Sequence, residues 1–183
     1  LRDGVVDIAI IGENLLVEKG EEISIKENLG FSKCRVSIAI PKEDTYKGVE
    51  SLTGKKIATS YPNTVKGFLA EKGIEAELHI INGSVEIAPN IGLSDAVCDI
   101  VSSGSTLFKN NLKEVEVLFK SEAVLAASST LDAEKNYILK KLQFRIQSVL
   151  KGRQSKYILM NVPNESIDKI SSILPVLKSP TVL

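Results

Sequence analysis

Apolar residues along this chain gather in two recurring patterns: short runs rich in β-branched residues, and longer segments with helical spacing. The short runs predict strands, and the helical spacing predicts amphipathic helices. Strands are predicted at residues 5–12, 34–41, 57–60, 75–81, 96–101, 114–119, 123–127 and 156–162. Helices are predicted at residues 15–18, 65–72, 85–91, 133–150 and 167–174, and a loop or poorly packed helix at residues 20–28. Alternation of strands and helices is typical of the α/β class.

Strands on either side of an inserted block predict two α/β lobes around a cleft. We expect lobe I to comprise residues 1–41 and 118–152, and lobe II to comprise residues 42–117. The predicted helix at residues 133–150 is long enough to link domains. The strand and helix that follow it predict the beginning of another domain over residues 153–183.

One apolar strand leads directly into a loop made only of small residues. The run at residues 96–101 contains a single acid, Asp99, and the loop that follows is Ser102-Ser103-Gly104-Ser105-Thr106. Backbone N–H groups at a helix start, together with hydroxyl groups, attract anions, and Gly104 can adopt a positive φ or approach a ligand closely. The pattern turns helix-like at Leu107. The stretch therefore predicts a phosphate-binding loop in the cleft, and its alternative is a plain turn.

Two other strand ends carry residues suited to ligand binding. The first predicted strand ends at Gly12, and open α/β sheets bind ligands at such carboxyl ends. An ordinary strand-to-helix turn explains Gly12 equally well. The N-terminus of the helix at residues 65–72 offers a second anion site, with Ser60, Asn63 or Thr64 as its cap.

Composition narrows the classes of function. The chain carries 23 basic and 23 acidic side chains, and a zero net charge argues against a general nucleic-acid binder. No apolar run reaches the roughly 20 residues that span a bilayer, so we expect no membrane partner. One histidine and two cysteines cannot build an obvious zinc site. Cys34 and Cys98 lie in apolar runs and are predicted to be small buried thiols rather than a disulfide, which fits a reducing, cytoplasmic compartment.

The stretch that contains the loop resembles the signature of the ATP phosphoribosyltransferases, the enzymes that open histidine biosynthesis. The signature combines a glutamate, a glycine, a small residue, an acid in an apolar strand, and a Ser/Thr-Gly-x-Thr-Leu loop. It is met here by Glu86, Gly92, Ser94, Asp99, Ser103, Gly104, Thr106 and Leu107. Further blocks resemble the family, in order, at residues 3–14, 54–63, 83–86, 112–117, 144–150 and 155–163. The resemblance covers essentially the whole chain.

The resemblance implies a fold like that of type II periplasmic binding proteins. It also implies the reaction of ATP with 5-phosphoribosyl 1-pyrophosphate, which yields N1-(5-phosphoribosyl)-ATP and pyrophosphate. Mg²⁺ would be carried mainly by the substrate pyrophosphate, so no metal ligands of the protein are expected. The resemblance implies that the ribose 5-phosphate is bound by Ser102, Ser103, Gly104, Ser105, Thr106 and Leu107.

Roles at the ribose and at the cleft wall follow from the same resemblance. Asp99 is the expected catalytic residue, facing the ribose, and a satisfied strand-end acid is its alternative. Glu86, Gly12 and Tyr61 are expected to bind substrate, with Glu86 and the turn that contains Tyr61 as weaker candidates. For Glu86, the alternative is an acid favoured by the start of a helix.

The last blocks resemble the passage into the third domain of the long form of the family. They imply the start of a ferredoxin-like regulatory domain, histidine as feedback inhibitor, and a homo-oligomer, either a dimer or a hexamer. The family's N-terminal segment with its basic residues does not precede Leu1, so we expect a chain truncated at both ends and doubtful activity of this piece alone. A non-catalytic two-lobed solute-binding module of similar fold is the alternative function.

Overall fold

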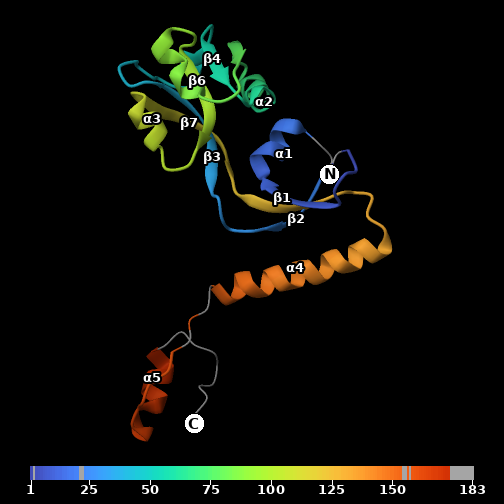
Figure 1. Ribbon diagram of the computed structural model, residues 1–183. Coiled ribbons are helices and arrows are strands. Elements are labelled where there is room, and N and C mark those ends of the chain that lie inside the picture. The colour runs from blue at the N-terminus through green and yellow to red at the C-terminus, as the bar shows by residue number, and fades with distance from the viewer. Residues whose placement is uncertain (2, 21–22, 154–155, 157, 174–183) are drawn as a thin grey trace. The chain divides into compact units, whose positions relative to one another are not determined.

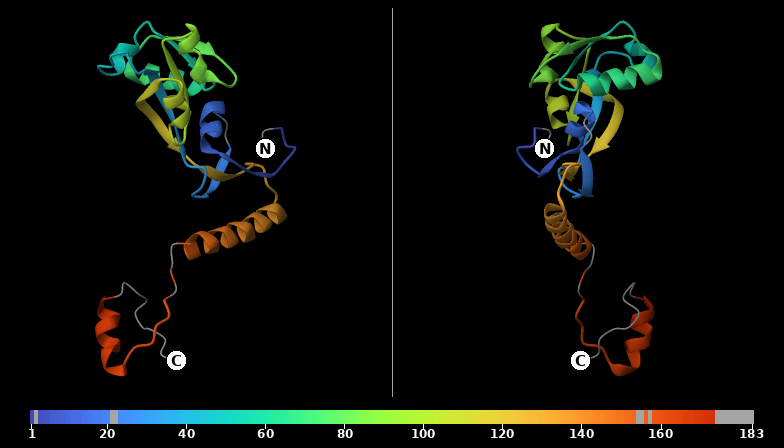
Figure 2. Two further views of the ribbon diagram at one scale, coloured as in Figure 1. Left: turned by 60° about the vertical axis from the view of Figure 1, so that its left-hand side comes forward. Right: turned by 90° about the vertical axis from the view of Figure 1, so that its right-hand side faces the viewer.

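The first part of the chain folds around two separate sheets (Figure 1). The computed structural model describes residues 1, 3–20, 23–153, 156 and 158–173. Residues 1–150 form one compact unit, and residues 151–183 belong to a second. Figure 2 shows the same elements from two further directions.

The three-stranded sheet has the order β1-β8-β2, and β8 is antiparallel to both neighbours. The five-stranded sheet has the order β5-β4-β6-β3-β7; β4 is parallel to β5 and β6, and β3 is antiparallel to β6 and β7. The strands are β1 Ile8–Gly12, β2 Ser24–Asn28, β3 Cys34–Pro41, β4 Lys56–Thr59, β5 Glu77–Ile80, β6 Ala96–Val101, β7 Leu112–Ser121 and β8 Ala123–Ala127. The first unit contains the helices α1 Glu13–Lys19, α2 Pro62–Lys72 and α3 Ser105–Lys109, with 3-10 turns η1 Val49–Leu52, η2 Val85–Ile87 and η3 Pro89–Ile91. Helix α4 Ala133–Arg153 begins in the first unit, and its last three residues belong to the second. The second unit contains η4 Asn164–Ser166 and α5 Ile167–Ile173.

Strand β8 is buried along its whole length because a helix packs on each of its faces. Leu16 of α1 packs with Val124 and Ala126, and Leu139 of α4 packs with Leu125. Alternate residues of a strand point to opposite faces, so an all-apolar strand needs both covers. This explains why the run at residues 123–127 has no polar position.

The five-stranded sheet is also covered on both faces. One face packs against Val65 and Leu69 of α2, and the other packs against Val85 of η2 and Leu107 of α3. Central strands β3 and β6 supply residues to both clusters. The sheet therefore holds β6 between two packed layers, and the small-residue loop begins where β6 ends.

Sheet membership moves the expected boundary between the lobes. Strand β3 and all of β7 belong to the five-stranded sheet, so this sheet takes in residues 34–121 rather than the expected 42–117. The chain passes between the sheets over residues 29–33 and at Glu122. The apolar run of β3 suited either lobe, and only its pairing with β6 and β7 decides which lobe it joins.

Most predicted elements are present, and three are wrong. Residues 24–28, expected in a loop or helix, form the edge strand β2, whose polar sequence Ser-Ile-Lys-Glu-Asn lacks the apolar alternation of a strand. The helix expected at residues 85–91 is two 3-10 turns. The strand expected at residues 156–162 is absent among its described residues, 156 and 158–162. The helix expected to end at residue 174 ends at Ile173, and residue 174 lies outside the described part of the chain.

Both cysteines are free thiols, as predicted. Cys98 is fully buried in β6, and burial raises the pKa of its thiol, whereas Cys34 is partly exposed. A raised pKa keeps the thiol protonated, so Cys98 packs as a small apolar side chain. Across the described residues, no helix combines the length and apolarity that a membrane crossing requires.

Candidate functional site

The small-residue loop lies at the end of β6, as the sequence predicts. Gly104 adopts φ +79° at the N-cap of α3, the left-handed conformation that glycine tolerates best. Leu107 is buried at 8% exposure and anchors α3 in the core, while Ser102, Ser103, Ser105 and Thr106 are exposed. The loop thus presents its polar atoms to solvent from a fixed base.

The loop leaves several hydrogen-bond donors available. Within the described residues, the backbone N–H groups of Ser103, Gly104 and Thr106 find no acceptor. The hydroxyls of Ser103 and Ser105 lie 3.0 Å apart, and the Ser105 N–H contacts the Ser103 hydroxyl only at 3.4 Å. Free N–H groups beside hydroxyls at the start of a helix form a site for an anionic group.

Asp99 lies on β6, three residues before the loop. Its Oδ1 accepts hydrogen bonds from the backbone N–H of Ile100 at 2.8 Å and from the Ser60 hydroxyl at 3.2 Å. Burial raises the pKa of the Asp99 carboxyl, and the charge of Glu86 raises it further. Glu86, from η2, therefore lies close enough to Asp99 for its charge to act on the Asp99 carboxyl. A half-buried carboxylate near exposed anion-binding donors can stabilise positive charge that develops between them.

Gly12 and Tyr61 lie where the two sheets meet. A Cβ on Gly12 would lie 2.3 Å from the Asn14 side-chain oxygen, so a larger residue there would displace the Asn14 side chain, whereas the φ of −71° suits any residue. The Asn14 amide donates to the Tyr61 hydroxyl at 2.8 Å, and the Ser121 hydroxyl donates to the Asn14 amide oxygen at 3.0 Å. Tyr61 is buried at 5% exposure, and burial raises the pKa of its hydroxyl. Direct substrate contact by Gly12 and Tyr61 stays a prediction, while the hydrogen bonds of Asn14 with Tyr61 and Ser121 join the two sheets.

Arg35 is a residue of this region that the sequence reading did not single out. Its guanidinium donates to the Ser102 carbonyl at 3.0 Å and to both carboxylate oxygens of Glu114, at 2.5 and 2.6 Å. The sequence could have indicated its role, because an arginine inside a mostly apolar strand needs a partner for its charge.

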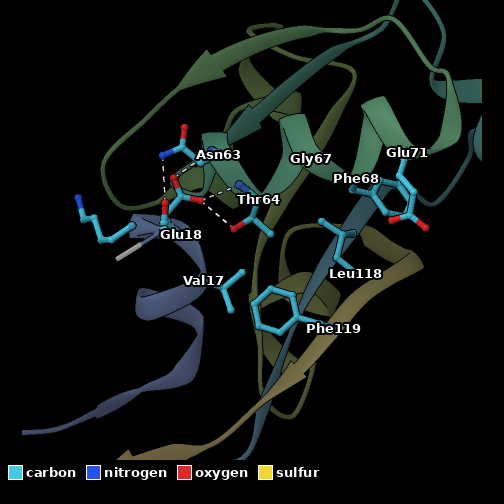
Figure 3. A pocket seen from close by; sticks show the side chains of 11 residues that line it. Val17, Glu18, Asn63, Thr64, Gly67, Phe68, Glu71, Leu118 and Phe119 are labelled. Atoms are coloured by element: carbon cyan, nitrogen blue, oxygen red, sulfur yellow. Dashed lines mark hydrogen bonds between the residues drawn. The ribbon is translucent and has the colours of Figure 1, made fainter. Parts of the chain in front are cut away.

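The second predicted anion site, at the N-terminus of α2, is occupied by a side chain of the protein (Figure 3). The Glu18 carboxylate accepts the backbone N–H groups of Asn63 and Thr64 at 3.0 and 2.9 Å, and the Thr64 hydroxyl at 2.8 Å. Thus Glu18, from α1, caps α2, and none of the three caps suggested by the sequence makes a side-chain cap bond there. Negative charge at a helix N-terminus is favourable, so the Glu18 carboxylate stabilises the start of α2. The contact also links α1, which packs on the three-stranded sheet, with α2, which packs on the five-stranded sheet.

A pocket of about 490 Å³ lies beside this contact, and it does not include any residue of the small-residue loop. Val17, Phe68, Leu118 and Phe119 give it an apolar wall, as Figure 3 shows. The phosphate-binding candidates therefore lie outside this pocket.

Replacing Glu18 with Ala is expected to lower the free energy of unfolding by about 0.5–2 kcal/mol, because the N–H groups of Asn63 and Thr64 at the start of α2 lose their carboxylate acceptor. Urea denaturation followed by circular dichroism measures the change. Glu71→Ala is the matched control, since Glu71 lies on the same helix α2 with its side chain 76% exposed. Equal losses in the two variants would contradict the capping role of Glu18.

Comparison with known proteins identifies the family. Residues 1–148 match the family model for ATP phosphoribosyltransferase, and residues 152–183 match the model for its C-terminal domain. The chain belongs to the ATP phosphoribosyltransferase family. The family assignment confirms the resemblance read from the signature around the loop.

Curated relatives agree with this assignment. The chain is 55% identical over 181 residues to the ATP phosphoribosyltransferase of Cytophaga hutchinsonii, covering 99% of the chain and 63% of the relative. It is 54% identical over 180 residues to that of Parabacteroides distasonis, covering 98% of the chain and 64% of the relative. The chain thus spans just under two thirds of the length of these relatives.

Solved structures of this family and of binding proteins share the fold. The ATP phosphoribosyl transferase (HisG:HisZ) complex from Thermotoga maritima aligns with a TM-score of 0.71 and 29% identity, over 83% of this chain and 74% of that chain. The substrate-binding protein of an amino acid ABC transporter aligns with a TM-score of 0.61 and 17% identity, over 84% and 69%. At that identity the second likeness concerns the fold alone, so it confirms the two-lobed architecture and gives no support to the solute-binding alternative.

Proposed function

We propose that this chain supplies much of the catalytic part of an ATP phosphoribosyltransferase, which transfers the phosphoribosyl group of 5-phosphoribosyl 1-pyrophosphate to ATP and releases pyrophosphate. The observation that carries the proposal is the match of residues 1–148 to the family, with the anion-binding loop directly after Asp99. The proposal extends to the whole protein, whose relatives are longer than this chain.

The loop binds the ribose 5-phosphate in this proposal. The free N–H groups of Ser103, Gly104 and Thr106 and the hydroxyls of Ser103 and Thr106 donate to the phosphate oxygens. Binding at this end of the ribose places the anomeric carbon for attack by ATP, and such positioning supplies a large part of the rate of a two-substrate reaction. The Ser103–Ser105 hydroxyl contact at 3.0 Å keeps these donors together before the phosphate binds.

Asp99 acts at the ribose. As pyrophosphate leaves, the anomeric carbon and ring oxygen gain positive charge, and a carboxylate held by Ser60 and Ile100 stabilises that charge or accepts ribose hydroxyl groups. Both of these hydrogen bonds go to Oδ1 of Asp99, so Oδ2 is the oxygen proposed to interact with the substrate. In this proposal Glu86 adds a second negative charge close to Asp99.

Mg²⁺ enters this proposal with the substrate. Among the described residues, no three His, Cys, Asp or Glu side chains gather as a metal cage. Magnesium keeps several waters and is commonly held by substrate phosphates with few protein ligands, so in this proposal the pyrophosphate brings the ion. When bound there, Mg²⁺ neutralises charge on the leaving group.

The C-terminal part of the proposal concerns regulation. The match of residues 152–183 to the family's C-terminal domain supports the presence of that domain, and we propose that it binds histidine as feedback inhibitor in a homo-oligomeric, cytoplasmic enzyme. The ferredoxin-like fold of that domain is part of the same proposal.

The test is formation of phosphoribosyl-ATP by the full-length gene product, followed by its absorbance, which differs from that of ATP. Product that requires both substrates and Mg²⁺ is the expected result. Retention of a small ligand without product would favour the solute-binding module instead.

A further inference from the structure

Arg35 connects three neighbouring strands of the five-stranded sheet at the point where β6 enters the small-residue loop. Arg35 itself lies on β3, Glu114 lies on β7, and Ser102 directly follows β6. The β3–β6 pairing ends with Arg35 opposite Val101, so the Ser102 carbonyl is the first one beyond the paired residues. The side chain of Arg35 supplies the hydrogen bond to that carbonyl, at 3.0 Å.

The hydrogen bond to Ser102 also sets the direction of a donor of the loop. The Ser102 carbonyl and the Ser103 N–H belong to one planar peptide unit and point in opposite directions. Holding the carbonyl toward Arg35 therefore points the Ser103 N–H away from Arg35. That N–H is one of the free donors of the proposed phosphate site.

Glu114 keeps the guanidinium in this orientation. Its two oxygens accept from Nε and Nη2 of Arg35, which is a bidentate arrangement, and Nη1 remains for Ser102. The hydrogen bond from Arg35 lowers the pKa of the Glu114 carboxyl, so the carboxylate stays charged at neutral pH. The two side chains are only 30% and 23% exposed, which restricts alternative rotamers. Lysine lacks the planar set of donors and cannot make both contacts in this way.

We propose that Arg35, oriented by Glu114, is a positioning residue that fixes the small-residue loop for the 5-phosphate of 5-phosphoribosyl 1-pyrophosphate. Arg35 does not touch the substrate; it acts through the Ser102 peptide. This inference rests on the proposed function and adds a residue outside the family signature.

Steady-state kinetics of Arg35→Lys and Glu114→Gln in the full-length gene product test the role. Each variant is expected to raise KM for 5-phosphoribosyl 1-pyrophosphate about tenfold, with KM for ATP unchanged and kcat lowered less than threefold. The double variant is expected to resemble Arg35→Lys alone, because both changes disrupt the same hydrogen bonds among Arg35, Glu114 and the Ser102 carbonyl. Arg145→Lys, the same change at an exposed position of α4, is the matched control and should leave all constants unchanged.

The outcomes separate this inference from the proposed function. If the wild-type protein forms no phosphoribosyl-ATP, the proposed function fails. If the wild type is active and both variants keep the wild-type KM for 5-phosphoribosyl 1-pyrophosphate, or raise both KM values equally, the positioning role is overturned. A loss of folded protein in Arg35→Lys would lower kcat without the selective change in KM; Glu114→Gln, which keeps the shape of its side chain, then decides the question.

Discussion

Replacing Asp99 with Asn is expected to lower kcat by about 100- to 1,000-fold without lowering the stability of the fold at pH 7. The loss of rate is the size found when one group that stabilises transition-state charge is removed. Asparagine keeps the shape of the side chain, and its carbonyl oxygen can still accept from Ser60 and Ile100. The steady-state assay of phosphoribosyl-ATP formation measures the loss.

In contrast to the loss of activity, the stability of the fold at pH 7 should rise in Asp99→Asn, because burial raises the pKa of Asp99 in the folded state. The folded protein then binds this proton more tightly than the unfolded chain does. Stability contributed by the protonated group is lost as pH rises from the ordinary carboxyl pKa, about 3.9, through the raised one. Above that interval the charged Asp99 costs the fold a constant amount, which Asp99→Asn removes.

Thermal unfolding of wild type and Asp99→Asn between pH 4 and pH 8 measures this difference. The melting temperature of the variant should exceed that of the wild type at pH 7, and the gap should narrow toward pH 4. Ser60→Ala is a useful control because it removes one hydrogen bond to the carboxylate and keeps the charge. A variant Asp99→Asn that is less stable at pH 7 and keeps its activity would establish Asp99 as a satisfied strand-end acid.

The parts of the fold that the sequence predicted are those in which local pattern and burial agree. The short apolar runs of β6 and β8 predicted buried strands, and Gly104 between such a run and Leu107 predicted a turn into a helix. Gly104 has a positive φ, which is one of the two uses that its position in the loop suggested.

The parts that the sequence did not predict depend on partners far along the chain. Strand β2 is polar and is held by pairing with β8, together with the Gln143 side chain, which donates to the Lys26 carbonyl. Glu18 caps a helix that begins more than 40 residues later, and Arg35 finds Glu114 on another strand. None of these contacts leaves a periodic signal, because each depends on how the sheets and helices come together.

Gly104→Val is expected to raise KM for 5-phosphoribosyl 1-pyrophosphate at least tenfold in the full-length gene product. Gly104 has φ +79°, and a Cβ there would meet no atom within 4 Å, so the cost of the substitution is backbone strain and not a clash. Left-handed φ costs an L-residue about 1–2 kcal/mol, and a β-branched side chain is among the least tolerant. Relief of that strain turns the peptide units of the loop, which moves the free N–H groups of Ser103 and Thr106 out of line with a phosphate.

Gly54→Val separates this effect from strain alone. Gly54 has φ +70°, its Cβ would also meet no atom within 4 Å, and it lies before β4, outside the small-residue loop. Both variants should lose a similar amount of stability in urea denaturation, but only Gly104→Val should lose affinity for 5-phosphoribosyl 1-pyrophosphate. Equal KM values in the two variants would contradict the assignment of the phosphate site to this loop, because the two glycines have matched backbone strain and differ only in location.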